Sequence, residues 1–397
     1  MSHYVPLSNN VFTLAIGFRC GAINEDKKHS GISHLLEHVM FRGKKDVMKK
    51  MIQLGVKWNA VTSLDYTMYH LSCAMNNAKK ACRLLLTVVS SFDDITVAEF
   101  NMEKKVVIEE ISLYPDGHVN EDMFRMVHRG TPYFNSIRGT EKTLANIKLD
   151  DIKSYHARFY NRPFVTFSCP KNQIKTVEKW LGIGEVKQGD SQNIDINMNR
   201  HLSSKKYQFI TICKEKDELE LCRLAYLGFP KFDIRSNVAS LIAFILTIRL
   251  TEQVREKKGK VYSIHIKHDA HACAGTFIME FKTQYGNLSS ILRAFKKQVD
   301  ALKTINMATV KQYSERLRRY KETTDPMTMT MQRLKSKIFG AEYENMDRAT
   351  AGAAGAAATI SILEFSDTVK TLFDNTRLAY VCKTRESKDE IQKIFDK

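Results

Sequence analysis

The chain contains 397 residues, of which 43% are hydrophobic, and it carries a formal net charge of +17. This length predicts two or three globular domains with an ample core, and no apolar run reaches the roughly 18 residues of a membrane span, so we expect no transmembrane segment. Eight cysteines without a C-x-x-C pair favour reduced thiols in an intracellular protein over a disulfide framework.

The N-terminus shows neither a secretory signal peptide nor an Arg-rich presequence. We therefore expect a reducing compartment, either the cytoplasm or the matrix of a mitochondrion-type organelle.

Residues 12–20 are predicted to form a strand, and a loop over 24–29 leads to a helix over 31–43, with Ser30 as its N-cap.

This helix carries an H-x-x-E-H motif formed by His34, Glu37 and His38. Residues four apart on a helix lie on the same face, so both imidazoles point toward one place, as a zinc site requires. Glu37 reaches the same side. A helix with two core histidines would show the same pattern, so the zinc interpretation depends on a third ligand further along the chain.

The third ligand is expected on a later helix. After a helix over 46–54, strands within 56–73 and a helix over 78–91, Thr96 and Glu99 match a capping box. The helix that they begin should end before Pro115. It carries Glu103 and Glu110, which share one face. We favour Glu110 as the ligand, and Glu109 is the rival. The structural alternative is a solvated acidic stripe.

Two histidines and one carboxylate leave a zinc coordination position open for water, as catalytic sites require. Zinc lowers the pKa of such a water. Glu37 would accept the proton of this water and deliver it to the leaving amine. Glu103 would orient a histidine ligand from behind.

The order of elements in the second half of the chain predicts a repeat of the first half. A polar segment over 189–205 is the predicted linker, between a zinc-binding domain over 1–188 and an inactive repeat domain over 206–397. Residues 224–229 echo 14–18, and a helix, two strands and further helices follow in the same order. The period is about 200 residues. The helix after Phe229 has no histidine, so only the first copy would bind metal.

Several motifs resemble one peptidase family over about residues 10–385. H-x-x-E-H with a glutamate about 70 to 80 residues later is the inverted zinc motif of the pitrilysin-like peptidases. Four further segments resemble the N-A-x-T-S…T-x-Y strand, the glutamate helix, the I-x-G-T-E turn and the R-E-x-x-G-x-x-Y element of that family. They are residues 59–69, 103–110, 137–141 and 255–262. The chain most resembles the half-length branch, which includes mitochondrial processing peptidase and bacterial relatives.

The resemblance implies an α+β fold with two related α/β domains, each a mainly antiparallel sheet flanked by helices. It implies one Zn²⁺ per chain and a substrate strand formed by Asn59, Ala60, Val61 and Thr62. It also implies that Arg255 and Tyr262 bind the substrate carbonyl or the tetrahedral intermediate. A half-length chain would pair as a homodimer, or as a heterodimer with a related chain, so that four domains close into a chamber.

These observations favour a zinc endopeptidase that cleaves peptides or extended presequences. One alternative is a non-catalytic structural or chaperone-like subunit of the same fold. The chain has all the zinc-motif residues and no clear glycine-rich loop of the non-catalytic processing subunit, which favours the catalytic type. The other alternative is a basic surface that binds nucleic acid or membrane. The charge is spread in short clusters, so a solvated surface is the simpler interpretation, and no nucleic-acid partner is expected.

Overall fold

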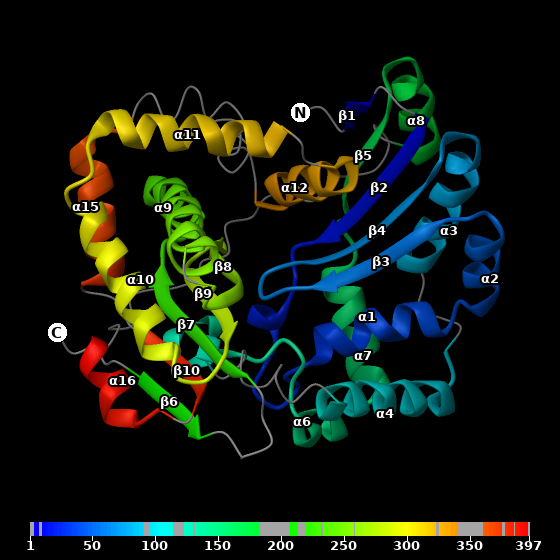
Figure 1. The fold of residues 1–397 in the computed structure, drawn as a ribbon. Helices are drawn as coiled ribbons and strands as arrows, with labels where there is room; N and C mark the ends of the chain where they lie inside the picture. Colours follow the sequence, from blue (N-terminus) through cyan, green and yellow to red (C-terminus); the bar gives the residue numbers. More distant parts are fainter. Residues whose placement is uncertain are drawn as a thin grey trace. The chain divides into compact units, whose positions relative to one another are not determined.

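The computed structural model divides the chain into two compact units (Figure 1). The first comprises Met1–Pro115, Asn135–Asp195 and Thr323–Glu344, and the second comprises Asp116–Phe134, Ile196–Glu322 and Asn345–Lys397. Within them the structure describes residues 4–7, 10–90, 95–113, 123–129, 132–182, 207–212, 219–231, 233–257, 259–322, 325–339, 360–374, 378–384 and 386–395.

The sheet of the first unit has the strand order β1-β5-β2-β4-β3. The strands span Tyr4–Leu7 (β1), Phe164–Pro170 (β5), Val11–Phe18 (β2), Thr67–Ala74 (β4) and Lys57–Thr62 (β3). Only β1 and β5 pair in parallel; every other pairing in this sheet is antiparallel. Because β3 is last in the order, one of its sides pairs with β4 and the other is an edge.

Helices pack against the buried side chains of this sheet. They are α1 (Ile32–Arg42), α2 (Lys45–Gln53), α3 (Ala78–Ser90), α4 (Val97–Leu113), α6 (Glu141–Asn146), α7 (Leu149–Phe159), α8 (Ile174–Leu181) and α12 (Pro326–Phe339). Short 3₁₀ turns span Ala22–Asn24, Met75–Asn77 and Lys171–Gln173. The core joins apolar side chains of β2 and β4 to those of α1, α3 and α7.

The sheet of the second unit repeats this topology. Its order is β6-β10-β7-β9-β8, the same succession of first, fifth, second, fourth and third strand. The strands span Tyr207–Ile212 (β6), Leu378–Thr384 (β10), Glu220–Gly228 (β7), Gly275–Thr283 (β9) and Val261–Ala270 (β8), and only β6 and β10 pair in parallel. The α+β class and the two related, mainly antiparallel sheets are therefore as predicted.

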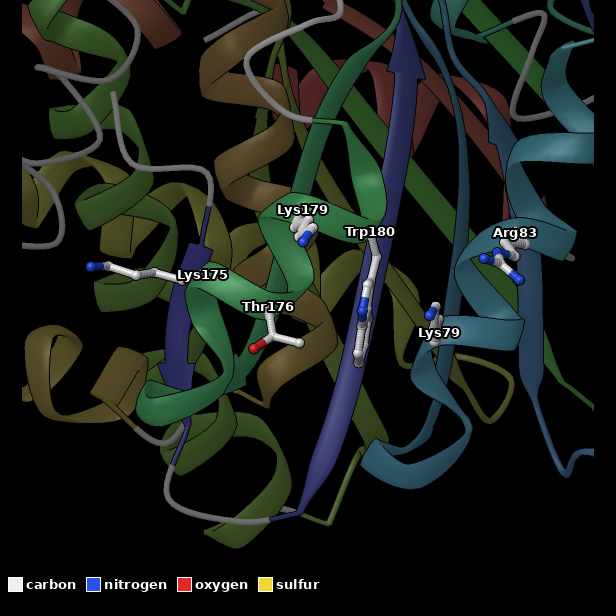
Figure 2. Close-up of a pocket in the computed structure, with 6 residues that line it drawn as sticks. All are labelled: Lys79, Arg83, Lys175, Thr176, Lys179 and Trp180. Atoms are coloured by element: carbon white, nitrogen blue, oxygen red, sulfur yellow. The ribbon is translucent and has the colours of Figure 1, made fainter.

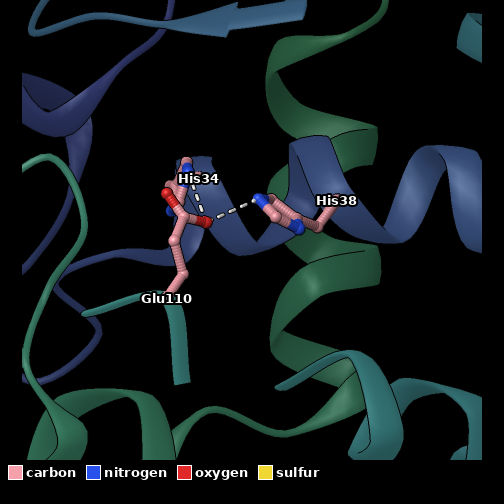
Figure 3. Close-up of side chains that lie close together, drawn as sticks. All are labelled: His34, His38 and Glu110. Carbon is pink, nitrogen blue, oxygen red and sulfur yellow. Dashed lines mark ion pairs between the residues drawn. The ribbon is translucent and has the colours of Figure 1, made fainter. Parts of the chain in front are cut away.

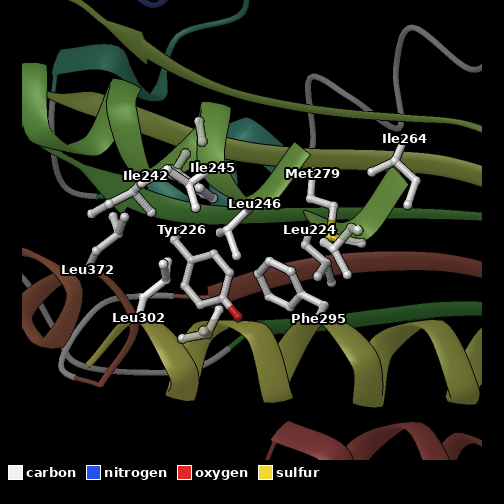
Figure 4. Close-up of a cluster of buried hydrophobic side chains, with 14 of the residues drawn as sticks. Leu224, Tyr226, Ile242, Ile245, Leu246, Ile264, Met279, Phe295, Leu302 and Leu372 are labelled. Atoms are coloured by element: carbon white, nitrogen blue, oxygen red, sulfur yellow. The ribbon is translucent and has the colours of Figure 1, made fainter. Parts of the chain in front are cut away.

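Long helices surround the core of the second unit in its described part. They are α9 (Ile234–Leu250), which continues as a π-helix over Thr251–Glu256, α10 (Leu288–Leu302), α11 (Met307–Glu322), α15 (Ile362–Phe373) and α16 (Lys388–Phe395). Figure 4 shows side chains of α9 such as Ile242 and Leu246 above Tyr226 of β7 and Phe295 of α10. Among the described residues one helix, Ile234–Glu256, has the length and composition to span a membrane, and half of its apolar window is buried. A buried core helix meets the same test.

Each unit contains a segment that the predicted boundaries, 1–188 and 206–397, assign to the other domain. In the first unit, α12 packs on β1, β2 and β5, and the Thr330 hydroxyl lies 2.7 Å from that of Thr13. In the second unit, Met123 and Val127 pack on Ala225 and Ala379. Each sheet is thus covered by a segment that sequence order assigns to the other half. The predicted linker over 189–205 lies outside the described residues.

A glycine explains how closely α12 approaches its sheet. A Cβ atom at Gly17 of β2 would lie 2.8 Å from Ile338 and 2.9 Å from Leu334, both on α12. A larger residue at this position would require the side chains of Leu334 and Ile338 to shift. This close contact fixes α12 on the first unit.

Candidate metal centre

The start of α1 is fixed by a buried carboxylate. The N-cap is Gly31, at φ 95°, rather than Ser30, and no side-chain cap bond is formed there. Instead the carboxylate of Glu25 accepts hydrogen bonds from the backbone N–H groups of Gly31, at 2.7 Å, and Ser33, at 2.9 Å. Burial raises the pKa of Glu25 to about 7, and these hydrogen bonds act in the opposite direction. Glu25 therefore satisfies two N–H groups at the first turn of the helix.

A tight backbone contact holds the same end of α1. A Cβ atom at Gly31 would lie 2.6 Å from the carbonyl oxygen of Arg138. A Cβ atom at Gly139 would lie 2.2 Å from the carbonyl oxygen of Ser30. Both glycines also have positive φ, which other residues rarely adopt. The I-x-G-T-E turn over 137–141 therefore packs backbone to backbone against the entrance to the helix.

We predict that Glu25→Ala destabilises the first unit by about 1–3 kcal/mol, because two buried N–H groups lose their acceptor. Urea unfolding measures the change. The control is Glu364→Ala on α15, where an exposed carboxylate caps Ser361 N–H at 2.7 Å and water can replace it. A Glu25→Ala protein as stable as the control would show that the buried cap does not hold α1.

Helices α1 and α4 pack together and bring His34, His38 and Glu110 to one point (Figure 3). The Oε2 atom of Glu110 lies 3.4 Å from His38 Nε2 and 4.0 Å from His34 Nε2. One nitrogen or oxygen from each of the three residues lies within 4.8 Å of the other two. Figure 3 shows the carboxylate between the two rings. Two imidazoles and a carboxylate at this separation suit a tetrahedral zinc ion with one open position.

The protonation state of one histidine, His34, also suits a metal. Burial lowers the pKa of His34 to about 3, with smaller contributions from His38 and Arg138, so its imidazole is neutral at physiological pH. Its buried Nδ1 has no hydrogen-bond partner among the described residues. Burial also lowers the pKa of His38, but its hydrogen bond to Glu103 and the nearby carboxylates outweigh this, and the pKa is raised.

Glu103 orients His38. Its Oε1 lies 3.2 Å from His38 Nδ1, and its Oε2 lies 3.5 Å from the guanidinium of Arg42. The carboxylate is almost fully buried. This contact turns the other nitrogen of His38, Nε2, toward Glu110. The structure thus places Glu103 behind the site, where a residue that orients a ligand would lie.

The helix face favours one of the two glutamates at the end of α4. Glu110 is partly buried and faces α1, whereas Glu109 is exposed. Glu103 and Glu110 share the face toward α1, as their spacing predicted.

Glu37 lies on the same helix as the two histidines and is held by a strand. Its Oε2 accepts a hydrogen bond of 2.5 Å from the hydroxyl of Thr62 at the end of β3. Burial raises the pKa of Glu37. A carboxylate with a raised pKa is a better proton acceptor, which suits a general base. The sequence had placed Thr62 only in the substrate strand.

The predicted substrate strand, Asn59 to Thr62, lies in β3 at the edge of the sheet. Its residues pair with β4 from Asn59↔His70 to Thr62↔Thr67. Ala60 is buried, and the Asn59 side-chain oxygen accepts a hydrogen bond from the Ala60 N–H. The far side of an edge strand presents backbone groups to which another extended segment can bind.

Arg255 and Tyr262 both lie in the second unit. Arg255 is exposed in the π-helix that follows α9, and Tyr262 lies in β8. The side chain of Tyr262 is outside the described residues. The histidines lie in the first unit, so the roles of Arg255 and Tyr262 stay predictions.

Comparisons with known proteins agree with this site. Residues 7–141 match the family described as insulinase (peptidase family M16). An uncharacterized zinc protease, YmxG of Bacillus subtilis, is 29% identical over 75% of this chain and 76% of its own. A probable mitochondrial-processing peptidase subunit beta of Schizosaccharomyces pombe is 24% identical over 43% of this chain and 40% of its own.

The fold is shared as well. The crystal structure of a protease from Helicobacter pylori covers 96% of both chains with a TM-score of 0.79, at 18% identity. Over residues 7–141 the chain matches the insulinase, or M16, peptidase family, and it is similar to bacterial zinc proteases and to the beta subunit of a mitochondrial processing peptidase. The predicted family resemblance is thereby confirmed.

Proposed function

We propose that this chain is a zinc-dependent endopeptidase that hydrolyses peptide bonds in peptides or extended presequences. The observation that carries the proposal is the convergence of His34, His38 and Glu110, with Glu37 on the same helix. When bound there, zinc would supply a Lewis acid that polarises the substrate carbonyl and acidifies water. The neutral His34 and the oriented Nε2 of His38 support zinc as the cofactor, with one ion per chain.

The residues of the chain would divide the remaining work. Glu37 accepts a proton from the attacking water and delivers it to the leaving amine. Thr62 holds the Glu37 carboxylate by its hydroxyl, so the base stays in one orientation. An extended substrate would add to the edge of β3 and form main-chain hydrogen bonds with Asn59 to Thr62. Thr62 thereby connects the strand that binds the substrate to the base.

The zinc dependence of hydrolysis tests the proposal. Purified protein should contain one zinc ion per chain by elemental analysis. Removal of the metal by a chelator should abolish peptide hydrolysis, and one equivalent of zinc should restore it. Full hydrolysis by metal-free protein would overturn the proposal. A non-catalytic subunit would bind zinc or peptide without cleaving it, but the complete set of ligands and base favours catalysis.

Thr62→Val should lower kcat by about 10- to 100-fold and change KM little, because a hydrogen bond to a charged group is worth roughly 1.5–3 kcal/mol. Valine keeps the shape of threonine and its preference for strands. Steady-state kinetics on a defined peptide measures the change.

Thr62→Ser is the control for this prediction, because it keeps the hydroxyl and should retain most of the activity. Equal losses in the serine and valine variants would show that the methyl group, and not the bond to Glu37, matters at this position.

The chain would act as a pair, either with itself or with a related half-length chain. Arg255 and Tyr262 would then serve the zinc of the partner and stabilise the oxyanion as it develops. Support comes from similarity to a relative that is named as a subunit.

Complementation tests this pairing. Glu37→Gln and Tyr262→Phe chains should each be nearly inactive, since loss of one oxyanion donor typically costs about 100- to 1000-fold. Mixed under exchanging conditions, they should regain a fraction of wild-type activity, because one site of the mixed dimer then carries neither defect. If mixed dimers form and remain inactive, the residues do not act across an interface.

We also propose that the protein works in a reducing intracellular compartment, either the cytoplasm or an organelle matrix. All seven cysteines in the described residues are free, and six of them are buried. Burial raises the pKa of thiols such as Cys20 and Cys82, which makes them poor nucleophiles.

A further inference from the structure

A pocket of the first unit is lined by helices that carry none of the metal ligands. Figure 2 shows its lining side chains, which come from α3 and α8. They are Lys79, Arg83, Lys175, Thr176, Lys179 and Trp180, and the cavity volume is about 650 Å³. Four of the six residues are cations and none is acidic. The metal ligands lie on α1 and α4, so the pocket is formed by a different pair of helices.

The cations are arranged unfavourably for the helices themselves. Lys79 and Arg83 lie four residues apart on α3, and Lys175 and Lys179 lie four residues apart on α8. Like charges at this spacing face each other and destabilise a helix. Helix α3 contains no acidic residue, and the one acid of α8, Glu178, does not line the pocket. The arrangement is therefore repulsive until an anion joins it.

Some lysines elsewhere in the chain have acidic partners. Lys45 pairs with Glu99 at 2.9 Å, and Lys303 pairs with Asp374 at 3.0 Å. In the described part of the chain, the four cations of the pocket form no ion pair. Their charges are thus available to a ligand.

Trp180 adds a flat apolar surface to this charged pocket. It is partly buried, because one part of the ring packs on the core of the unit. Figure 2 shows the indole between Thr176 and Lys179 of α8 and Lys79 of α3, with Arg83 beyond and Lys175 extending away from it. No cation of the described residues stacks on this ring. Its exposed part is therefore available to a planar group.

The size of the cavity favours a small ligand over a macromolecule. Small-molecule sites typically enclose about 300–1,000 Å³, and this one lies within that range. Sites for single-stranded nucleic acid use several aromatic side chains along a groove, whereas this pocket has one. A membrane surface would meet a broad basic face rather than a concavity. Clustered cations, a hydroxyl and one ring together match phosphate groups attached to a planar base.

We propose that this pocket binds a nucleoside di- or triphosphate. The base stacks on Trp180, and the phosphates lie among Lys79, Arg83 and Lys179, with the Thr176 hydroxyl as a further donor. This binding is independent of zinc and of peptide hydrolysis. It gives a local function to part of the +17 charge.

Fluorescence of Trp180 tests the proposal directly, because the only other tryptophan is Trp58. In the full chain with Trp58→Phe, adenosine triphosphate should quench the emission with saturation, and calorimetry should give the same Kd. Adenosine alone and inorganic triphosphate should each bind at least about tenfold more weakly, since each lacks one half of the recognised chemistry.

The substitutions Lys79→Gln and Arg83→Gln, made together, should raise the Kd at least about tenfold through lost charged hydrogen bonds. The matched control is Lys80→Gln with Lys105→Gln, which removes two exposed charges outside the pocket and should leave the Kd unchanged within about twofold. Thermal melting confirms that both double variants are folded.

Three results would overturn the proposal. They are no binding of adenosine triphosphate, equal losses in the pocket variant and the control, and equal affinity for inorganic triphosphate. Binding of an oligonucleotide or of anionic vesicles that adenosine triphosphate does not displace would also overturn it.

Discussion

Glu37→Gln should retain zinc and lose peptide hydrolysis by about 10²- to 10⁴-fold, the usual contribution of a general base. Glutamine keeps the size of the side chain and its oxygen can still accept the hydrogen bond from Thr62. It cannot accept a proton from water at neutral pH. The metal ligands are untouched, so any loss of rate reports on proton transfer.

The measurement is single-turnover hydrolysis of a defined peptide by protein with verified zinc content. Glu109→Gln is the control, because it removes an exposed carboxylate from α4 without touching the site. Near-normal turnover in the Glu37→Gln variant, with zinc bound, would reject Glu37 as the base.

Glu110→Gln should release zinc, whereas Glu109→Gln should retain one ion per chain. Loss of a residue that only orients a ligand typically costs about 10- to 100-fold in metal affinity, so loss of a ligand should cost more. The structure gives the reason for the difference. The Glu110 carboxylate lies 3.4 Å from His38 Nε2, and Glu109 points to solvent.

Zinc content after gel filtration and competition with a zinc indicator measure both variants. Full occupancy in Glu110→Gln, together with loss in Glu109→Gln, would assign the third ligand to Glu109. Thermal melting checks that both variants are folded, since loss of metal alone should not unfold α4.

The local part of the site could be predicted from the sequence because helix geometry fixes it. Four-residue spacing places His34 and His38 on one face, and seven-residue spacing does the same for Glu103 and Glu110. Periodicity was less reliable for the apolar side of α4. Val107 and Ile111 are buried, but Val106, the neighbour of Val107, is 41% exposed because it lies on a different face.

Contacts between segments distant in sequence could not be predicted in this way. Nothing in the spacing of residues shows that Glu25 caps α1, or that Thr62 donates a hydrogen bond to Glu37. Both contacts depend on where a loop and a strand end relative to a helix. Glu25 lies six residues before Gly31 and outside the helix, so helix periodicity does not relate the two residues.

The exchange of segments between the units has the same origin. The pattern of α12 predicts an apolar face but does not say which sheet that face covers. The two sheets share one strand order, so each offers a similar surface. The choice depends on fits such as that of Leu334 and Ile338 against Gly17, which only the folded chain shows. The repeat itself could be predicted, because the residue patterns of the sequence indicate the order of strands and helices.

The most direct measurement of the central claim is mass-spectrometric identification of products from a peptide library incubated with the purified protein. We predict cleavage at internal peptide bonds, its loss in the presence of a chelator, and its return when zinc is added. The Glu37→Gln protein with zinc bound should give no products above background. Absence of any cleavage by zinc-loaded wild-type protein, or cleavage that neither the chelator nor Glu37→Gln reduces, would contradict the account.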